Sequence, residues 1–269
     1  MLGAIFRKEK LFFISFASGA RQNWGVIVSL GAILNALGIL LGGIFGLARR
    51  KPISAQAQFF FRNFLGLAVI FFGLWLIYQN VGGTFLSLLK QIFLALVAVT
   101  LGHLLGRLLA LQKISNRLGR FAGNAIAAAQ KSQAGNSAAG FNACTILFCA
   151  APMGIIGAIT DGLSGYFYLL AVKAVMDALA TASFVKMFRW PAALSAIPVF
   201  AFFGAITLVV QIYAAPFLAA HGLINSVNVA AGFICCAVAL VIFEVRKVDL
   251  ANYLPALAVA PLLAWLLGH

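Results

Sequence analysis

The sequence predicts an all-α protein, a polytopic bundle of transmembrane helices, and three observations lead to this fold class. Hydrophobic residues make up 64% of the 269 residues and charged residues only 9%, against about 45–50% and about 25% in soluble domains. The apolar residues form repeated runs of about 20, the length that crosses a bilayer core as a helix. Short polar segments that carry most of the basic residues separate these runs. The chain is therefore expected to lie in a membrane.

Eight apolar runs predict eight membrane spans. The spans are expected at residues 25–48, 59–79, 83–110, 139–160, 165–186, 192–214, 224–245 and 251–268. They divide the chain into an N-terminal extension (1–24), a first transmembrane half with three spans (25–111), a cytoplasmic amphipathic segment and linker (112–138) and a second transmembrane half with about five spans (139–269). Because three is odd, a structural repeat across the linker would be inverted in the membrane. The first and fourth spans share an early asparagine and several glycines, which either such a repeat or membrane composition alone would explain.

The basic residues predict which ends of the spans face the cytoplasm. Of 19 lysine and arginine residues, 13 fall in or beside the connections that follow the first, third, fifth and seventh spans. Such residues stay on the cytoplasmic side, so both termini are expected outside. Arg7, Lys8, Lys10 and Arg21 conflict with this orientation, and the side of residues 1–24 stays open. Lipid also explains the net charge of +14, so the bilayer is the expected partner and nucleic acid is not.

A face of small residues runs along the first span. Asn35, Gly38, Gly42 and Gly46 follow one another at i, i+3, i+7 and i+11, on one side of a helix. Small residues at this spacing let two helix backbones approach closely, so helix packing is the simpler interpretation. A substrate-lining role for this face is the alternative.

The fourth span is expected to be broken near Pro152, because proline lacks an amide donor and disrupts a helix interior. A broken helix often lines a binding site in transporters, although a simple kink explains the same residues. The following letters "TDGLSG" predict a turn. Thr160 and Asp161 would then lie at the helix end, where Asp161 is either a cap of the fifth span or a ligand group.

Lys173 and Asp177 lie near the middle of the fifth span, one helical turn apart, on a face that also carries Thr181. A lone charge at this depth costs about 3 kcal/mol on insertion scales. The two charges either neutralise each other as a packing pair or mark a path for an ion, a proton or a solute. Replacing a structural pair by apolar residues is often neutral or stabilising, which favours the path. The candidate solute- or ion-binding residues are Asp161, Lys173, Asp177, Thr181, Asn35 and Thr160.

No enzymatic activity, metal or cofactor is expected. The three histidines are scattered without metal-ligand spacing, and no arrangement of nucleophile and base is recognisable. The four cysteines fall inside apolar spans, where they are expected as small buried side chains rather than as disulfides.

Several segments are similar to the uncharacterised bacterial inner-membrane proteins of the YqgA type. The similar segments are "GAILNALGILLGGIFG", "LFCAAPMGIIGAITDGLSG", "AVKAVMDALATASF", "LSAIPVFAFFGAITL" and "NYLPALAVAPLL". The resemblance covers about residues 29–265 and implies a polytopic membrane protein of the bacterial inner membrane, but no substrate. The chain departs from the family pattern at Asp177-Ala178, where that pattern has Asp-Gly, and in residues 1–24, which have no counterpart.

These observations predict a secondary transporter of a small solute that uses an intramembrane Lys/Asp site. Transport would be passive or ion-coupled, because the sequence carries no ATP-binding motif. The alternative is a non-transporting or channel-like membrane protein in which the pair is structural. A homo-oligomer is compatible with either function.

Overall fold

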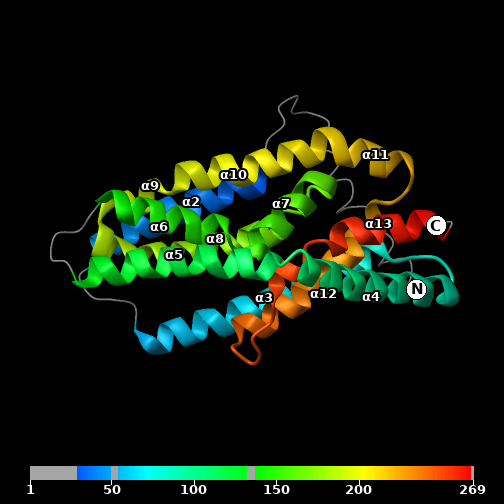
Figure 1. Cartoon of the computed structure of the whole chain (residues 1–269), viewed down its shortest axis with the longest axis horizontal. Coiled ribbons are helices and arrows are strands. Elements are labelled where there is room, and N and C mark those ends of the chain that lie inside the picture. The colour runs from blue at the N-terminus through cyan, green and yellow to red at the C-terminus, as the bar shows by residue number, and fades with distance from the viewer. Residues whose placement is uncertain (1–28, 50–53, 132–136, 268–269) are drawn as a thin grey trace, which may run out of the picture.

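The computed structural model of the chain describes residues 29–49, 54–131 and 137–267 (Figure 1). Within these ranges the chain forms helices and no strand, which confirms the predicted all-α fold class. The α-helices are α2 (Leu30–Ala48), α3 (Ala55–Asn80), α4 (Phe85–Leu108), α5 (Leu111–Lys131), α6 (Ser137–Cys149), α7 (Pro152–Ser164), α8 (Tyr168–Phe188), α9 (Trp190–Leu194), α10 (Ala196–Val209), α11 (Ala215–Ala220), α12 (Ile224–Ile242) and α13 (Ala256–Leu266). A π-helix, η1 (Val210–Ala214), joins α10 to α11, and a 3-10 helix, η2 (Leu250–Tyr253), precedes α13.

Six helical segments in the described ranges are long and apolar enough to cross a membrane. They are α2, α3, α4, α8, the Trp190–Ala220 segment made of α9 to α11, and α12. A seventh is the pair α6 and α7, whose axes are bent by 59° at their junction, so the predicted break near Pro152 is confirmed. The expected eighth span corresponds to Leu250–Leu266, which is shorter than the others. By length and composition the structure thus gives six or seven spans rather than eight.

The outer surface of the bundle is apolar. On α4, Phe85, Leu86 and Phe93 expose between 64% and 77% of their surface. Only 17% of the most apolar stretch of α4 is buried, against 50% for α8 and 56% for α12. An exposed apolar surface of this extent is unfavourable in water and matches the acyl chains of a bilayer. The chain is therefore a membrane protein in which α8 and α12 are central and α4 is peripheral.

The glycine face of α2 packs directly on α8. A Cβ atom at Gly38 or Gly46 would overlap the backbone carbonyl oxygens of Ala174 or Ala182, respectively. The two backbones can approach this closely because glycine has no side chain. The predicted close packing of the glycines on this face is thus confirmed, and a substrate-lining role for Asn35 of the same face stays a prediction. Because residue numbers increase together along the contact, α2 and α8 run parallel.

The three helices before α5 each pack antiparallel on one of the last three spans. The contacts that define these directions are Ser29–Thr207 and Gly43–Ala193 for α2 with α9 and α10, Gly66–Phe243 and Gly73–Cys235 for α3 with α12, and Gly102–Ala256 and Gly106–Asn252 for α4 with α13 and its preceding turn. Successive spans that alternate in direction would give these pairings. These contacts pair the first three spans with the last three, whereas the predicted inverted repeat relates the first span to the fourth, and that repeat stays a prediction.

Two hydrophobic cores meet at α8. One core joins α3, α7, α12 and α13, and α8 contributes Leu169 and Val172 to it. The other joins α2, α6, α9 and α10, and α8 contributes Leu170 and Phe188. Figure 1 shows α2, α6 and α10 gathered toward one end of the molecule and α4, α12 and α13 toward the other. The helix with the buried charges therefore lies between the two parts.

The segment between the two halves is more helical than predicted. The sequence favours an amphipathic helix followed by a flexible linker, but α5 continues through residue 131 and α6 begins at Ser137. The stretch of alanines at 127–129 explains the difference, because alanine has the highest helix propensity. The predicted N-terminal extension, residues 1–24, lies outside the described residues.

Candidate functional site

The centre of the candidate site is an ion pair inside the bundle. Nζ of Lys173 donates a hydrogen bond to Oδ2 of Asp177, one turn further along α8. Both residues are buried, with 2% and 7% of their surface exposed. The i,i+4 spacing read from the sequence therefore places the two charges in direct contact and away from lipid.

Two aromatic rings flank the lysine of this pair. Nζ of Lys173 lies 5.8 Å from the ring centroid of Phe148 on α6 and 5.2 Å from that of Phe203 on α10. The ring faces attract a cation by about 0.5–2 kcal/mol, with the larger values in desolvated sites. Sequence reasoning missed both residues, because nothing distinguishes them among 25 phenylalanines.

The ion pair lies beside the break in the fourth span. α6 ends at Cys149 and α7 begins at Pro152, and a Cβ atom at Gly154 would lie 2.7 Å from Cε of Lys173. Glycine in the first turn of α7 thus leaves room for the lysine side chain. A broken helix leaves backbone groups at its two inner ends without intrahelical partners. The break and the charges therefore form one polar region within the membrane part of the protein.

Asn35 of α2 brings an amide group to the same region. It is fully buried and lies beside the Asp177 carboxyl group. Among the described residues, neither its Nδ2 nor its Oδ1 has a partner that meets hydrogen-bond geometry. A buried amide without partners costs free energy and commonly marks a water or ligand position. Thr145 of α6, also in the bundle, has a buried hydroxyl in the same condition.

Thr181 and Thr160 have structural partners. The hydroxyl of Thr181 donates to the carbonyl oxygen of Asp177 at 2.7 Å, within its own helix. The hydroxyl of Thr160 lies 3.1 Å from the carbonyl oxygen of Gly157 and 3.3 Å from that of Tyr166. These bonds satisfy backbone carbonyls in α8 and at the end of α7. Neither hydroxyl donor is available to a ligand in this structure.

Asp161 caps a helix, but not the one that the sequence suggested. Its Oδ2 accepts hydrogen bonds from the hydroxyl of Ser29 at 3.0 Å and from the backbone N–H of Gly31 at 3.1 Å. Both donors belong to the start of α2, where a carboxyl group satisfies free N–H groups and meets the positive end of the helix dipole. The hydroxyl of Thr207, 3.2 Å from Ser29, completes the cluster by donating to the carbonyl oxygen of Ala158.

The predicted turn at "TDGLSG" is also displaced. α7 continues through Ser164, and the chain reverses at Gly165, whose φ of 69° is left-handed. Asp161 is therefore a residue of the last turns of α7 and not of a loop. The expectation that it caps the start of the fifth span is wrong.

The six candidate residues consequently form two groups. Asn35, Lys173 and Asp177 come together at the break, and Thr181 is bonded to the backbone of Asp177. Thr160 and Asp161 lie toward the other end of α7, roughly 10 Å along its axis from Gly154. The second group stabilises helix ends. The first group combines charge, burial and unsatisfied polar atoms.

The model of a protein family described as "protein of unknown function (DUF554)" matches residues 30–265, which include all six candidates. The uncharacterized membrane protein YdfK of Bacillus subtilis is 24% identical over 237 residues, covering 88% of this chain and 96% of that protein. The uncharacterized protein YqgA of Escherichia coli is 25% identical over 238 residues, covering 86% and 94%. No solved structure matches the chain significantly.

Proposed function

This chain belongs to the DUF554 family, and we propose that it is a secondary transporter of a small solute in the bacterial inner membrane. The ion pair of α8, together with Asn35, is the site at which the solute or a coupling ion binds. Transport is passive or ion-coupled, and the protein has no enzymatic activity of its own.

The observation that carries this proposal is the position of the pair. Lys173 and Asp177 are buried at the break between α6 and α7, and the amide of Asn35 lies beside Asp177 without a well-formed hydrogen bond. Ionisable residues within membrane spans most often belong to ion, proton or substrate pathways. Transporters commonly place such sites at discontinuous helices.

A structural role alone accounts poorly for the same geometry. A buried ion pair is seldom more stable than apolar residues of similar volume, because desolvation offsets the attraction between the charges. Packing alone also gives no reason for a buried amide at Asn35 that lies beside the Asp177 carboxyl group without a well-formed hydrogen bond. A site that exchanges these contacts for a ligand accounts for both features.

The double variant Lys173→Met/Asp177→Asn tests the proposal, because it removes both charges and strands neither. We expect it to fold with a melting temperature close to that of the wild type. Solute flux into proteoliposomes, measured with an isotope-labelled solute panel and as pH-dependent current, should fall by about tenfold or more.

A matched control removes another ion pair of the same chain. Arg62 and Glu244 are 2.5 Å apart at the edge of the bundle, and their side chains are 33% and 69% exposed. The variant Arg62→Met/Glu244→Gln should keep wild-type flux. Normal flux in the Lys173/Asp177 double variant would make that pair a packing element and refute the proposed site.

A further inference from the structure

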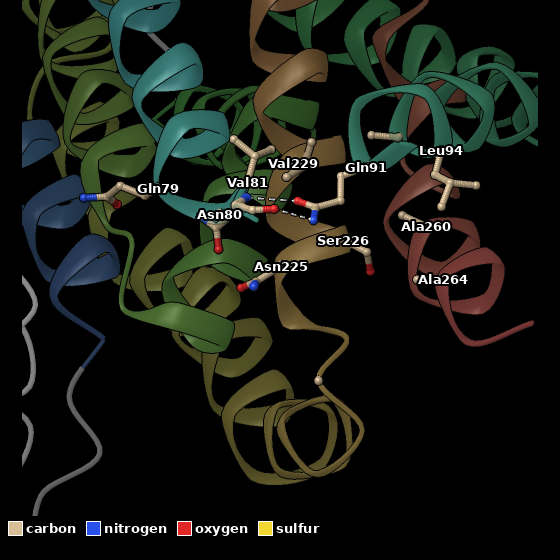
Figure 2. Close-up of a pocket in the computed structure, with 13 residues that line it drawn as sticks. Gln79, Asn80, Val81, Gln91, Leu94, Asn225, Ser226, Val229, Ala260 and Ala264 are labelled. Carbon is tan, nitrogen blue, oxygen red and sulfur yellow. Dashed lines mark hydrogen bonds between the residues drawn. The ribbon is translucent and has the colours of Figure 1, made fainter. Parts of the chain in front are cut away.

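A second polar region lies in a cavity at the ends of four other helices. The cavity has a volume of about 340 Å³, within the range of roughly 300–1,000 Å³ found for ligand pockets. Its walls come from the end of α3, the first turns of α4 and α12, and from α13 (Figure 2). The groups around Lys173 come instead from α2, α6, α7 and α10. The cavity is therefore separate from the ion pair.

Most polar lining side chains lie toward the end of α3 and the start of α12, where Val81 and Val229 also line the cavity, and the side toward α13 is apolar. The polar lining side chains are all uncharged: Gln79, Asn80, Gln91, Asn225 and Ser226. Figure 2 shows Leu94, Ala260 and Ala264 on the side of α4 and α13, across from Asn225. No charged residue is among the described residues that line the cavity.

Part of the polar wall is fixed by hydrogen bonds. Gln91 donates to the carbonyl oxygen of Gly82 at 3.0 Å and accepts from its N–H at 3.2 Å, as the dashed lines in Figure 2 show. Asn80 donates to the carbonyl oxygen of Leu76 at 2.8 Å and accepts from Nδ2 of Asn228 at 2.9 Å. The cavity is thus preformed on this side, which reduces the entropic cost of binding.

Two further amides lie at or behind the polar side of the cavity. Oδ1 of Asn228, a residue that is 1% exposed, has no hydrogen-bond partner among the described residues. Asn228 is bonded to Asn80 of the cavity wall. Asn225, one turn earlier on α12, lines the cavity and is bonded to none of the described residues. A buried acceptor without a partner is costly, and an ordered water or a ligand group that donates to it would remove this cost.

We propose that this cavity binds a small uncharged solute that carries hydroxyl or amide groups on one side and an apolar surface on the other. Carboxamides both donate and accept, so they match hydroxyl and amide groups equally. A charged solute would lose hydration here without meeting an opposite charge. This assignment of a binding site does not depend on the proposed function. Only the further step, that the solute bound here is also the transported one, rests on the proposed function.

The test uses the full chain in lipid nanodiscs and saturation-transfer NMR of four probes. Sorbitol and acetamide represent the uncharged class, and choline and glutamate represent the charged class. We expect saturable binding of sorbitol or acetamide, and none of the charged probes. Absence of binding by both uncharged probes, or equal binding of the charged ones, would overturn the proposal.

Three variants test whether any binding that is found takes place in the cavity. Asn225→Ala removes a free amide and should raise the apparent Kd by about fivefold, the effect of one lost hydrogen bond. Ala264→Leu fills the apolar wall and should abolish binding. Asn124→Ala removes an exposed amide of α5, outside the cavity, and should change nothing. Unchanged binding in both cavity variants would refute the assignment.

The Lys173→Met/Asp177→Asn variant separates this proposal from the proposed function. Loss of flux with intact probe binding supports both. Intact flux with intact binding refutes the ion-pair site and leaves the cavity assignment standing. Binding that is lost in this variant but kept in Asn225→Ala would place the probe at the ion pair and overturn the cavity assignment.

Discussion

Asp161 shows how one buried carboxyl group can stabilise the start of a helix far away in the chain, since it binds the N–H of Gly31, 130 residues earlier. It accepts two hydrogen bonds from the first turn of α2, and that turn lies against Thr207 of α10. Three helices therefore meet at a single side chain. A substitution of this residue should therefore reduce the stability of the protein more than it changes transport.

The variant Asp161→Ala should lower the free energy of unfolding by about 1–3 kcal/mol, the cost of a lost cap and of buried donors without partners. Thermal unfolding in detergent measures the change. Asp249→Ala, which removes an exposed carboxyl group, is the control and should leave the melting temperature unchanged. A wild-type melting temperature for Asp161→Ala would show that the contacts to Ser29 and Gly31 contribute nothing.

At this scale the sequence predicts local contacts well and distant ones poorly. The Lys173–Asp177 pair follows from helical spacing alone, because i and i+4 share one face. The partners of Asp161 do not, because Ser29 lies 132 residues away and only the packing of α2 on α7 brings them together. Phe148 and Phe203 could not be selected from the sequence either, because nothing distinguishes them among 25 phenylalanines.

At the scale of helices, Pro152 predicts the break in the fourth span correctly, because a missing amide donor acts locally. The position of the following turn was wrong by a few residues. Gly162, which suggested a turn, instead lies within α7, where a Cβ atom would approach the Thr207 carbonyl oxygen of α10 and the side chain of Val210 in η1. Glycine is therefore needed at position 162 for close packing between helices, and not for a turn.

The contact between α2 and α8 should depend on its small residues. In Gly42→Leu the new side chain would overlap the backbone of Ala178, so the helices must separate and Lys173 would lose its position. We expect lower folded yield and a melting temperature reduced by several degrees, corresponding to roughly 1–3 kcal/mol of overpacking. Gly119→Leu is the control, because no atom outside its own helix lies within 4 Å of a Cβ at that position. Equal melting of the two variants would contradict the packing.

At the scale of the whole molecule, composition is sufficient to predict a helical membrane protein, because 64% hydrophobic residues cannot be accommodated by a soluble core. Hydropathy alone does not give the number of spans, since it does not show that Leu250–Leu266 is shorter than the others or how sharply α6 and α7 are bent against each other. The pairing of helices is not predictable in this way either. It depends on which small-residue faces meet, as Gly106 of α4 meets Asn252.

The alternating directions of the helices predict on which side each connection lies. The end of α3 lies beside the start of α12, since Asn228 donates to Asn80, so Gly82 and Lys247 belong to opposite ends of the bundle. With the basic residues on the cytoplasmic side, single cysteines at Gly119 and Lys247 should react with a membrane-impermeant thiol reagent only after cells are opened. A cysteine at Gly82 should react in intact cells.

The parent protein, whose four cysteines are buried or half-buried, gives the background labelling. Opposite labelling at all three positions would reverse the orientation, and labelling of Gly119 and Lys247 from different sides would contradict the alternation itself.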